Sequence, residues 1–204
     1  MKYLLVILGV LFAKAQNEPA DMKLLLEIGL STDFSKNIET QNPAFGLGIW
    51  YRHPSEKNVR LELGGDFKTG NTIYNFTYGK NGYFYDVYSK GYILNLGGRM
   101  VHDFTIKNQK LEWISELTFN NFFFDGTGIP DDPIREPINN NTTVIVVDAE
   151  TISSLQFGQG LRLWKGNIGF GIKAGFTPYR LWYKSTVPKQ FNVFSAEATV
   201  SIKL

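Results

Sequence analysis

From Asn192 to Leu204, every second side chain is apolar. The apolar set is Phe194, Ala196, Ala198, Val200, Ile202 and Leu204, and the interleaved set is Ser195, Glu197, Thr199, Ser201 and Lys203. Successive side chains of an extended strand point to opposite faces, so one face of this segment suits hydrocarbon and the other suits water. Such a two-faced strand is typical of a barrel that spans a membrane.

The same period of two recurs in seven earlier segments, each close to the length of about 9–11 residues that a tilted transmembrane strand needs. They cover residues 23–31, 44–53, 58–68, 92–103, 110–120, 151–165 and 167–177. The segment 151–165 is the least regular, because Gln159 falls among the outward-facing residues Leu155, Phe157, Leu161 and Leu163. Together with residues 192–204, these segments predict eight antiparallel strands.

The connections between these segments alternate in length. Those at residues 53–58, 105–109 and 166–167 are tight, whereas those at residues 32–43, 69–91, 121–150 and 178–190 are long. The short turns therefore share one end, which in outer-membrane barrels faces the periplasm. The pattern predicts an all-β fold, an eight-stranded antiparallel up-and-down transmembrane β-barrel. Residues 69–91 allow two interpretations, a long external loop or a hairpin that extends the flanking strands beyond the membrane.

The N-terminal residues have the features of a secretory signal peptide. Lys2 supplies the positive charge, Leu4 to Ala13 form an apolar run, and Ala13-Lys14-Ala15 is a small-x-small cleavage site. We expect residues 1–15 to be a signal peptide and residues 16–204 to form one outer-membrane β-barrel domain. The apolar run is too short to span a bilayer, and no other stretch approaches the roughly 18 apolar residues of a transmembrane helix. Only a closed barrel could then cross the membrane.

Charge and cysteine content exclude several classes of protein. Without residues 1–15, the 21 basic residues fall to 19 and equal the 19 acidic residues, which disfavours nucleic acid as a partner. The chain has no cysteine. It therefore has no disulfide framework, no thiolate metal site and no cysteine that could carry a lipid anchor.

In these features the chain resembles the small eight-stranded outer-membrane β-barrel family of Gram-negative bacteria, which includes the OmpA/OmpX-type barrels and the group called outer membrane protein beta-barrel domain. The resemblance rests on the signal peptide, the eight two-faced strands, the alternating loops and the alternation up to Leu204. It implies a location in the cell outer membrane, in contact with outer-membrane lipid. Many members end in an aromatic residue that the assembly machinery reads, and Leu204 departs from that pattern.

The inward-facing positions carry nearly balanced charges. The interior of an eight-stranded barrel is just wide enough for side chains to fill it, and an unpaired buried charge is strongly disfavoured. We therefore predict a network of ion pairs that plugs the lumen, with Arg60, Arg99 and Arg162 tied to Glu62, Glu112 and Glu116. The alternative is a charged ring in a narrow passive pore for ions or small solutes. The residues of the predicted network are Glu27, Arg52, Arg60, Glu62, Asp66, Arg99, Glu112, Glu116, Arg162, Lys173 and Glu197.

Aromatic residues gather near both ends of the predicted strands, where interfacial girdles are expected. One girdle would hold Trp113 and Trp164, and the other Tyr92, Phe122, Phe123, Phe124, Tyr179, Trp182 and Tyr183. The segment 69–91 has more aromatic side chains than a girdle needs. We interpret the excess as an external surface that binds a protein or glycan, formed by Tyr74, Phe76, Tyr78, Tyr83, Phe84, Tyr85 and Tyr88.

Catalytic and metal-binding patterns are weak. Only His53 and His102 are present, and neither lies in a motif that places a base beside a serine or threonine nucleophile. The acidic residues within 125–132 match no calcium-binding spacing. We expect no enzymatic activity, no cofactor and no metal. The predicted function is that of an integral outer-membrane barrel with a structural or interaction role through its long external loops. A lipid-A-modifying barrel enzyme is a more distant alternative.

Overall fold

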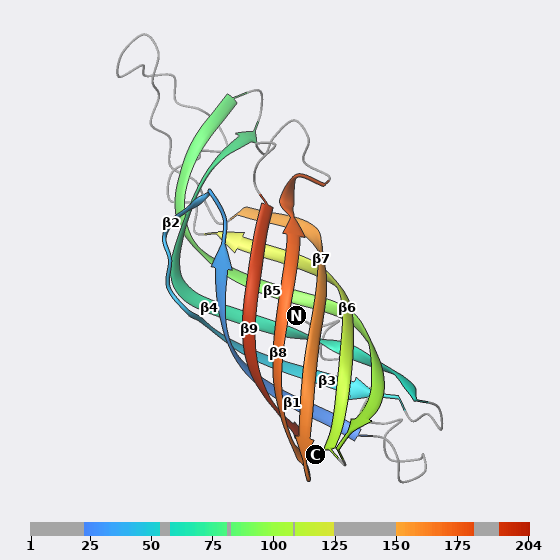
Figure 1. Ribbon diagram of the computed structural model, residues 1–204. Helices are drawn as coiled ribbons and strands as arrows, with labels where there is room; N and C mark the ends of the chain where they lie inside the picture. The colour runs from blue at the N-terminus through green and yellow to red at the C-terminus, as the bar shows by residue number, and fades with distance from the viewer. Residues whose placement is uncertain (1–22, 54–57, 81–82, 108, 125–149, 182–191) are drawn as a thin grey trace.

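The structure, a computed structural model, describes residues 23–53, 58–80, 83–107, 109–124, 150–181 and 192–204 (Figure 1). The predicted signal peptide, residues 1–15, lies outside the described residues. The strands are β1 (Lys23–Phe34), β2 (Ile38–Thr40), β3 (Ala44–Arg52), β4 (Val59–Lys80), β5 (Tyr83–Ile106), β6 (Gln109–Phe124), β7 (Glu150–Lys165), β8 (Ile168–Pro178) and β9 (Asn192–Lys203). A 3₁₀ turn, η1 (Tyr179–Leu181), follows β8.

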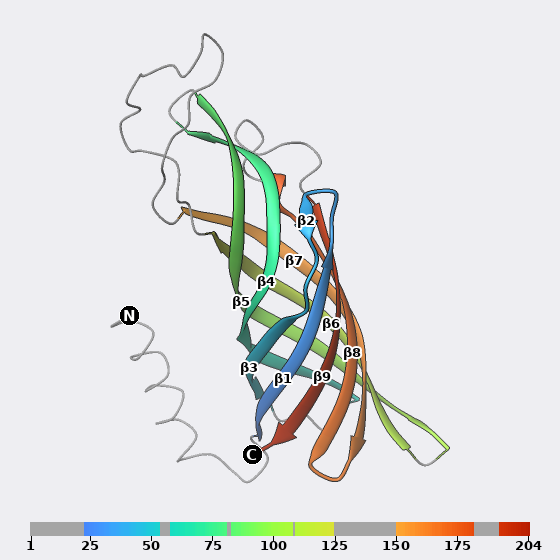
Figure 2. The ribbon, with the colours of Figure 1, turned by 90° about the vertical axis from the view of Figure 1, so that its left-hand side faces the viewer.

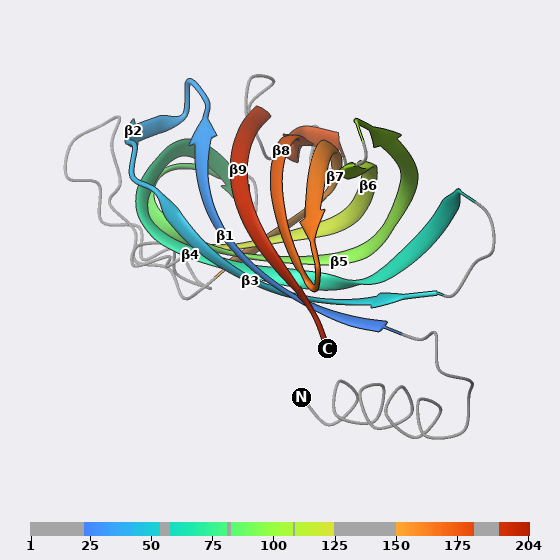
Figure 3. The ribbon, with the colours of Figure 1, turned by 60° about the horizontal axis from the view of Figure 1, so that its bottom comes forward.

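Eight antiparallel strands close into a barrel. The neighbours follow the order β4, β3, β1, β9, β8, β7, β6, β5, and β5 pairs with β4 to complete the ring. Figure 3 shows the curved wall from its lower end. The short strand β2 is an addition that pairs with β4 through Ile38 and Thr40. The predicted all-β, eight-stranded antiparallel barrel is confirmed, and no helix in the described part of the chain is long and apolar enough to cross a membrane.

The strands β4 and β5 are longer than the sequence pattern indicated. They pair from Val59 and His102 at one end to Lys80 and Tyr83 at the other. The interpretation of residues 69–91 as a loop is therefore wrong, and the alternative of a long hairpin is correct. The hairpin projects from the barrel in Figures 1 and 2, and we call the end from which it projects the hairpin end. The opposite end carries the short turns.

The outer wall is apolar and the interior is polar. Large apolar side chains are exposed around the ring, including Ile28 on β1, Leu47 on β3, Leu63 on β4, Leu117 on β6 and Ile172 on β8. Their sequence neighbours point inward and are buried. This inverted distribution leaves a surface that hydrocarbon solvates better than water, so the barrel is built to span a membrane.

Four residues predicted for the aromatic girdles lie inside the barrel instead. Trp164 follows the outward Leu163 and therefore points into the barrel, where it packs with Leu25 and Trp50. Phe122 and Phe124 point inward by the same rule, and so does Tyr179 on η1. Trp113, Tyr92 and Phe119 do face outward. Trp182 and Tyr183 lie outside the described residues.

The turn between β7 and β8 shows why the short connections can be so tight. Only Gly166 and Asn167 join the two strands, whose last pair is Lys165 with Ile168. Gly166 has a φ of 63°, a left-handed conformation that favours glycine because it has no side chain. Two-residue turns of this hand match the twist of the flanking strands.

Arginine substitutions at two depths of β4 should separate a lipid-facing wall from an ordinary surface. Leu63→Arg, inside the apolar band, should lower the free energy of unfolding by about 2–4 kcal/mol, whereas Val59→Arg at the strand end should cost about 0–1 kcal/mol. Urea unfolding of the barrel reconstituted in lipid vesicles measures both. Equal costs for the two variants would contradict a membrane-spanning orientation of β4.

Candidate functional site

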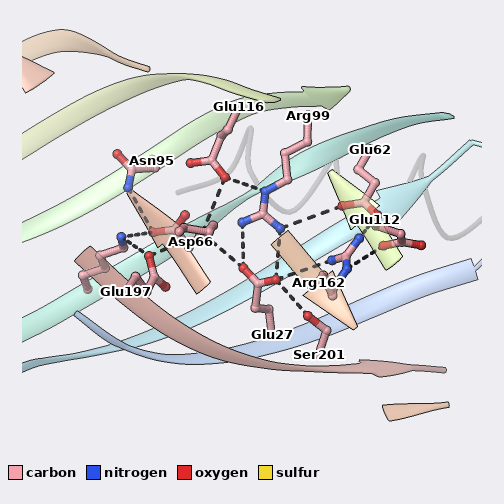
Figure 4. Close-up of polar contacts among 12 residues, drawn as sticks. Glu27, Glu62, Asp66, Asn95, Arg99, Glu112, Glu116, Arg162, Glu197 and Ser201 are labelled. Atoms are coloured by element: carbon pink, nitrogen blue, oxygen red, sulfur yellow. Dashed lines mark hydrogen bonds and ion pairs between the residues drawn. The ribbon is translucent and has the colours of Figure 1, made fainter. Parts of the chain in front are cut away.

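The interior of the barrel holds a cluster of buried ion pairs, shown in Figure 4, that we call the lumen network. Toward the short-turn end, two arginines and two glutamates form a closed ring. Arg52 binds Glu62 at 2.5 Å and Glu112 at 2.9 Å. Arg162 binds the same two carboxylates, at 2.6 Å and 2.7 Å. Each guanidinium therefore has two carboxylate partners, and each carboxylate has two arginines.

Arg99 is the centre of the next layer. Its terminal nitrogens donate to both oxygens of Glu27, at 3.1 and 2.6 Å, and its Nε donates to Glu116 at 2.5 Å. The indole ring of Trp50 lies against the guanidinium, with 3.5 Å between Cζ and the ring centroid. Arg99 is fully buried. A planar guanidinium suits this position because it makes paired hydrogen bonds and stacks on an aromatic face at the same time.

Two lysines connect this layer to the hairpin end. Lys173 lies between Glu27 at 3.3 Å, Glu116 at 3.5 Å and Glu197 at 3.3 Å. Lys68 binds Glu197 at 2.6 Å. There is space for the Glu197 carboxylate because Gly29 has no side chain: a Cβ at Gly29 would lie 2.3 Å from Glu197 Oε1. The close approach explains a glycine on the inner face of β1.

Amides continue the polar interior above the charges. Asn95 donates to Asp66 at 3.0 Å and accepts from Asn120 at 2.8 Å. Asn120 also donates to Gln156 at 3.3 Å. Asn95 and Asn120 are almost completely buried. The amides therefore pass hydrogen bonding from the charged layers toward the apolar residues at the hairpin end.

Ten of the eleven residues predicted for the lumen network lie inside the barrel and take part in these contacts. The exception is Arg60, which forms an ion pair with Asp103 at the short-turn rim, where both side chains are about a quarter exposed. Arg60 is therefore not tied to Glu62, Glu112 or Glu116. It lies too close to the end of β4 to reach the central layers.

Lys68 is a network residue that the sequence prediction omitted. It shares the inner face of β4 with Glu62 and Asp66, so its direction was evident from the alternation. Its partner was not, because Glu197 is on β9, and β3 and β1 separate the two strands in the wall. With Lys68 included, five cations face six carboxylates, and every one of the eight barrel strands contributes at least one of them.

A cluster of apolar side chains, which we call the cap, fills the barrel at the hairpin end. Phe122 contacts Tyr74 edge-on with ring centroids 4.8 Å apart, and Tyr179 packs against it at 5.4 Å. The Tyr74 hydroxyl donates to Asp33 at 2.5 Å. The members of the cap are Tyr74, Phe76, Val87, Ile93, Phe122, Phe124, Ile152, Tyr179 and Val193.

The cap changes the interpretation of the external aromatic surface. Tyr74 and Phe76 were expected on that surface, but they are 3% and 2% exposed because their side chains point into the barrel mouth. Tyr88 is 61% exposed. The side chains of Tyr78, Tyr83, Phe84 and Tyr85 lie outside the described residues, so their part in an external surface remains a proposal.

The described side chains inside the barrel interact mainly through ion pairs, hydrogen bonds and aromatic contacts. His53 and His102 are exposed at the short-turn end, away from the lumen network. Within the ranges that the structure describes, no group of three or more histidine, aspartate or glutamate side chains is arranged to hold a metal ion. Each network carboxylate faces a cation or an amide instead. The arrangement therefore holds strands together and fills space.

Comparisons with known proteins identify the fold. No family model matches the chain, and no curated protein matches its sequence. The solved structure of Neisserial surface protein A is 10% identical, with 91% of this chain and 97% of that chain covered and a TM-score of 0.52. The fold is therefore that of a small outer-membrane β-barrel.

Two further solved structures have lower TM-scores. The N-terminal β-barrel domain of Pseudomonas aeruginosa OprF is 11% identical, with 88% of this chain and 97% of that chain covered and a TM-score of 0.45. The outer membrane enzyme PagL is 12% identical, with 87% of this chain and 98% of that chain covered and a TM-score of 0.48.

Removing one carboxylate from the four-membered ring should strongly destabilise the barrel. Glu62→Gln leaves Arg52 with Glu112 and leaves Arg162 with Glu112 and the more distant Glu27 at 3.6 Å, and breaking a buried pair costs about 3–5 kcal/mol. Arg60→Gln removes the partly exposed rim pair and should cost about 0–1 kcal/mol. Urea unfolding in lipid vesicles measures both variants.

A double variant separates unpaired charge from lost packing. Arg52→Met combined with Glu62→Leu removes one charge of each sign and leaves Arg162 paired with Glu112, so much of the stability lost in Glu62→Gln should return. If Glu62→Gln unfolds at the wild-type urea concentration, the ring does not carry the stability assigned to it.

Proposed function

We propose that this protein is a non-enzymatic integral outer-membrane barrel that acts as a structural or interaction protein through its hairpin end. The observation that carries the proposal is the filled interior: the lumen network and the cap occupy successive levels of the barrel. Arg99, Arg162 and Glu62 are completely buried. A lumen filled in this way supports a role for the barrel as an anchor and moves the functional surface to the outside.

The projecting hairpin is the feature best suited to an external partner. In the described residues, β3 pairs with β4 no further than Gly70, β6 pairs with β5 no further than Gly91, and β2 with the adjacent Asn37 reaches β4 as far as Asn75. From the pair Thr77–Asp86 to the pair Lys80–Tyr83, no third strand pairs with β4 or β5 among the described residues, and strand edges of this kind can bind an extended segment of another chain. The exposed Tyr88 adds an aromatic ring for a protein or glycan contact.

Three observations support the outer membrane as the location. The exposed apolar band suits lipid, the fold is shared with Neisserial surface protein A, and the connections at one end are short. In barrels of that membrane the short turns face the periplasm and the longer connections face outward. The hairpin would then lie on the cell surface.

The filled lumen should prevent conduction. Wild-type protein in planar bilayers should show no steady conductance above the lipid background. Glu112→Ala combined with Glu116→Ala removes side-chain volume and leaves Arg99 and Arg162 with fewer partners, so this variant should conduct, lose stability, or do both. A large and stable wild-type conductance would favour the alternative, a narrow passive pore, and would overturn the proposal.

A photo-crosslinker at the hairpin should find an external partner. Benzoylphenylalanine incorporated at Tyr88 in living cells should form adducts with protein or surface polysaccharide, because this side chain is exposed on the ribbon. The same group at Tyr92, on the same face of β5 but within the lipid-facing wall, should form adducts with lipid alone. Electrophoresis followed by mass spectrometry of the adducts measures both.

The orientation needs its own control. The chain has no cysteine, so Tyr88→Cys should react with a membrane-impermeant maleimide on intact cells, and Gln109→Cys in a short turn should not. The reverse labelling would place the hairpin in the periplasm. If Tyr88 gives no protein or polysaccharide adducts beyond those at Tyr92, the interaction role of the hairpin is excluded.

A further inference from the structure

On β6 and β7, two facing polar side chains interrupt the apolar part of the outer wall. The outward positions in this part of β7 are Leu155, Phe157, Gln159, Leu161 and Leu163, and those in this part of β6 are Leu111, Trp113, Ser115, Leu117 and Phe119. Gln159 and Ser115 are each the central member of their five, and they face each other in the register of the two strands. A carboxamide and a hydroxyl therefore sit where the surrounding lipid is hydrocarbon.

The hydrogen bonds of Gln159 fix the direction of its amide group. Trp113 Nε1 donates to Gln159 Oε1 at 2.8 Å, and Ser115 Oγ donates to the same oxygen at 3.1 Å. An indole nitrogen can only donate, so the atom that faces Trp113 must be the carbonyl oxygen. The amide nitrogen of Gln159 then points away from both, and no acceptor among the described residues takes its two hydrogens.

A groove runs across the wall from this amide. Gln159 aligns in register with Ala174 on β8, Ala196 on β9 and Thr32 on β1, so the row continues over four strands with small side chains. The next row contains Ala198 and several larger residues, and together the two rows line a hollow of about 670 Å³. The larger residues on this border are Trp113, Leu161, Ile172 and Leu30. The strands β6, β7, β8 and β9 lie side by side in Figure 1.

A row of phenylalanines borders the groove on its other side. Phe157, Phe176, Phe194 and Phe34 align in register one level above the alanines. Phe176 and Phe194 are in contact, with ring centroids 4.7 Å apart. One face of the barrel therefore carries both a ridge of large side chains and a floor of small ones.

The unused amide hydrogens decide which kind of occupant fits. An amide without a partner in hydrocarbon is costly, and lipid chains at this depth offer no acceptor. The acceptor must come from another protein surface of the same polar pattern. A second copy of this chain supplies one, because the Ser115 hydroxyl that donates to Gln159 keeps lone pairs that can accept. In a two-fold contact Gln159 of each copy meets Ser115 of the other, so each amide gains an acceptor.

We propose that the face formed by β6, β7, β8 and β9 is a dimerisation surface, on which Gln159 of each copy donates to Ser115 of the other within the membrane. The inference rests on the proposed membrane location. The two-fold axis passes near Gln159, the alanine floor lets the two walls approach closely, and the phenylalanine row supplies the bulky contacts. The lumen network and the hairpin remain outside the contact.

Cysteine crosslinking in lipid vesicles tests the surface directly. Ala174→Cys lies beside Gln159 in the register and should give covalent dimers with a short bismaleimide. Leu63→Cys is the matched control, because it faces lipid on β4, which is opposite β8 in the ring of eight strands. It should give few dimers at the same ratio of protein to lipid.

Loss of the amide should weaken the dimer. Gln159→Leu in the Ala174→Cys background removes two hydrogen bonds across the interface and should lower the dimer fraction about tenfold, with an unchanged yield of folded barrel. Flotation of the vesicles on a density gradient reports membrane insertion separately. Failure to float would therefore contradict the proposed location rather than the dimer.

Three results would overturn the inference while the barrel still floats. These are equal crosslinking at Ala174→Cys and Leu63→Cys, an unchanged dimer fraction in Gln159→Leu, and a monomeric wild-type protein at every ratio of protein to lipid. If the monomer instead retains a bound lipid that Gln159→Leu releases, the groove is a lipid site and the dimer is excluded.

Discussion

The charges inside the barrel must neutralise one another, and most of the structure depends on that constraint. Eight strands enclose a space that side chains fill, so there is little water to solvate an isolated charge. Six carboxylates and five cations are connected there into one network, and a seventh buried carboxylate, Asp33, lies at the cap. Since every barrel strand contributes a member, a displaced strand would leave a partner without its counter-charge. The network therefore favours a single register for the whole ring.

The same constraint separates the charged part of the interior from its aromatic part. Charged side chains occupy the middle and the short-turn side, and the cap fills the hairpin end with aromatic residues. Between them, Asn95 and Asn120 bond to Asp66 and Gln156, so no abrupt boundary leaves a carboxylate against an apolar ring. Asp33 reaches the cap and accepts a hydrogen bond from Tyr74. Hydrogen bonds thus continue from the charged layers to the edge of the cap, where aromatic side chains fill the barrel mouth.

Much of the fold could be predicted from the sequence, because a period of two specifies which face each residue occupies. All eight strands and the inward direction of Glu27, Arg99 and Glu197 follow from it. The period predicts which face of the strand a side chain occupies, but it does not predict the position of that side chain along the barrel axis. Arg60 lies on the inner face of β4, but it pairs with Asp103 at the rim. The pair between Lys68 and Glu197 depends on the tilt and stagger of strands that are distant in sequence.

The sequence allowed the hairpin as one of two interpretations, but it did not indicate which aromatic residues form the cap, for a related reason. Residues 69–91 alternate less cleanly, because above the membrane an outward side chain need not be apolar. The sequence predicts Tyr74 and Phe76 as surface aromatic residues. They are buried because η1 and β6 place Tyr179 and Phe122 beside them at the hairpin end of the barrel. No local pattern in the sequence reveals that meeting. Composition indicated an excess of aromatic residues there, and the closed barrel determined which of them are buried.

The proposed interaction role depends on the outer surfaces of the barrel, because the described side chains of the interior are paired with one another. A lipid-facing wall needs only apolar side chains, so Gln159 and Ser115 gain nothing for the stability of an isolated barrel in hydrocarbon. Their hydrogen bonds with Trp113 satisfy the carbonyl and leave the amide hydrogens without an acceptor in the described residues. The far part of the hairpin also lies beyond the barrel wall, where no third strand pairs with it among the described residues. A partner would explain both features: the amide of Gln159 in the lipid-facing wall and the strand edges of the hairpin.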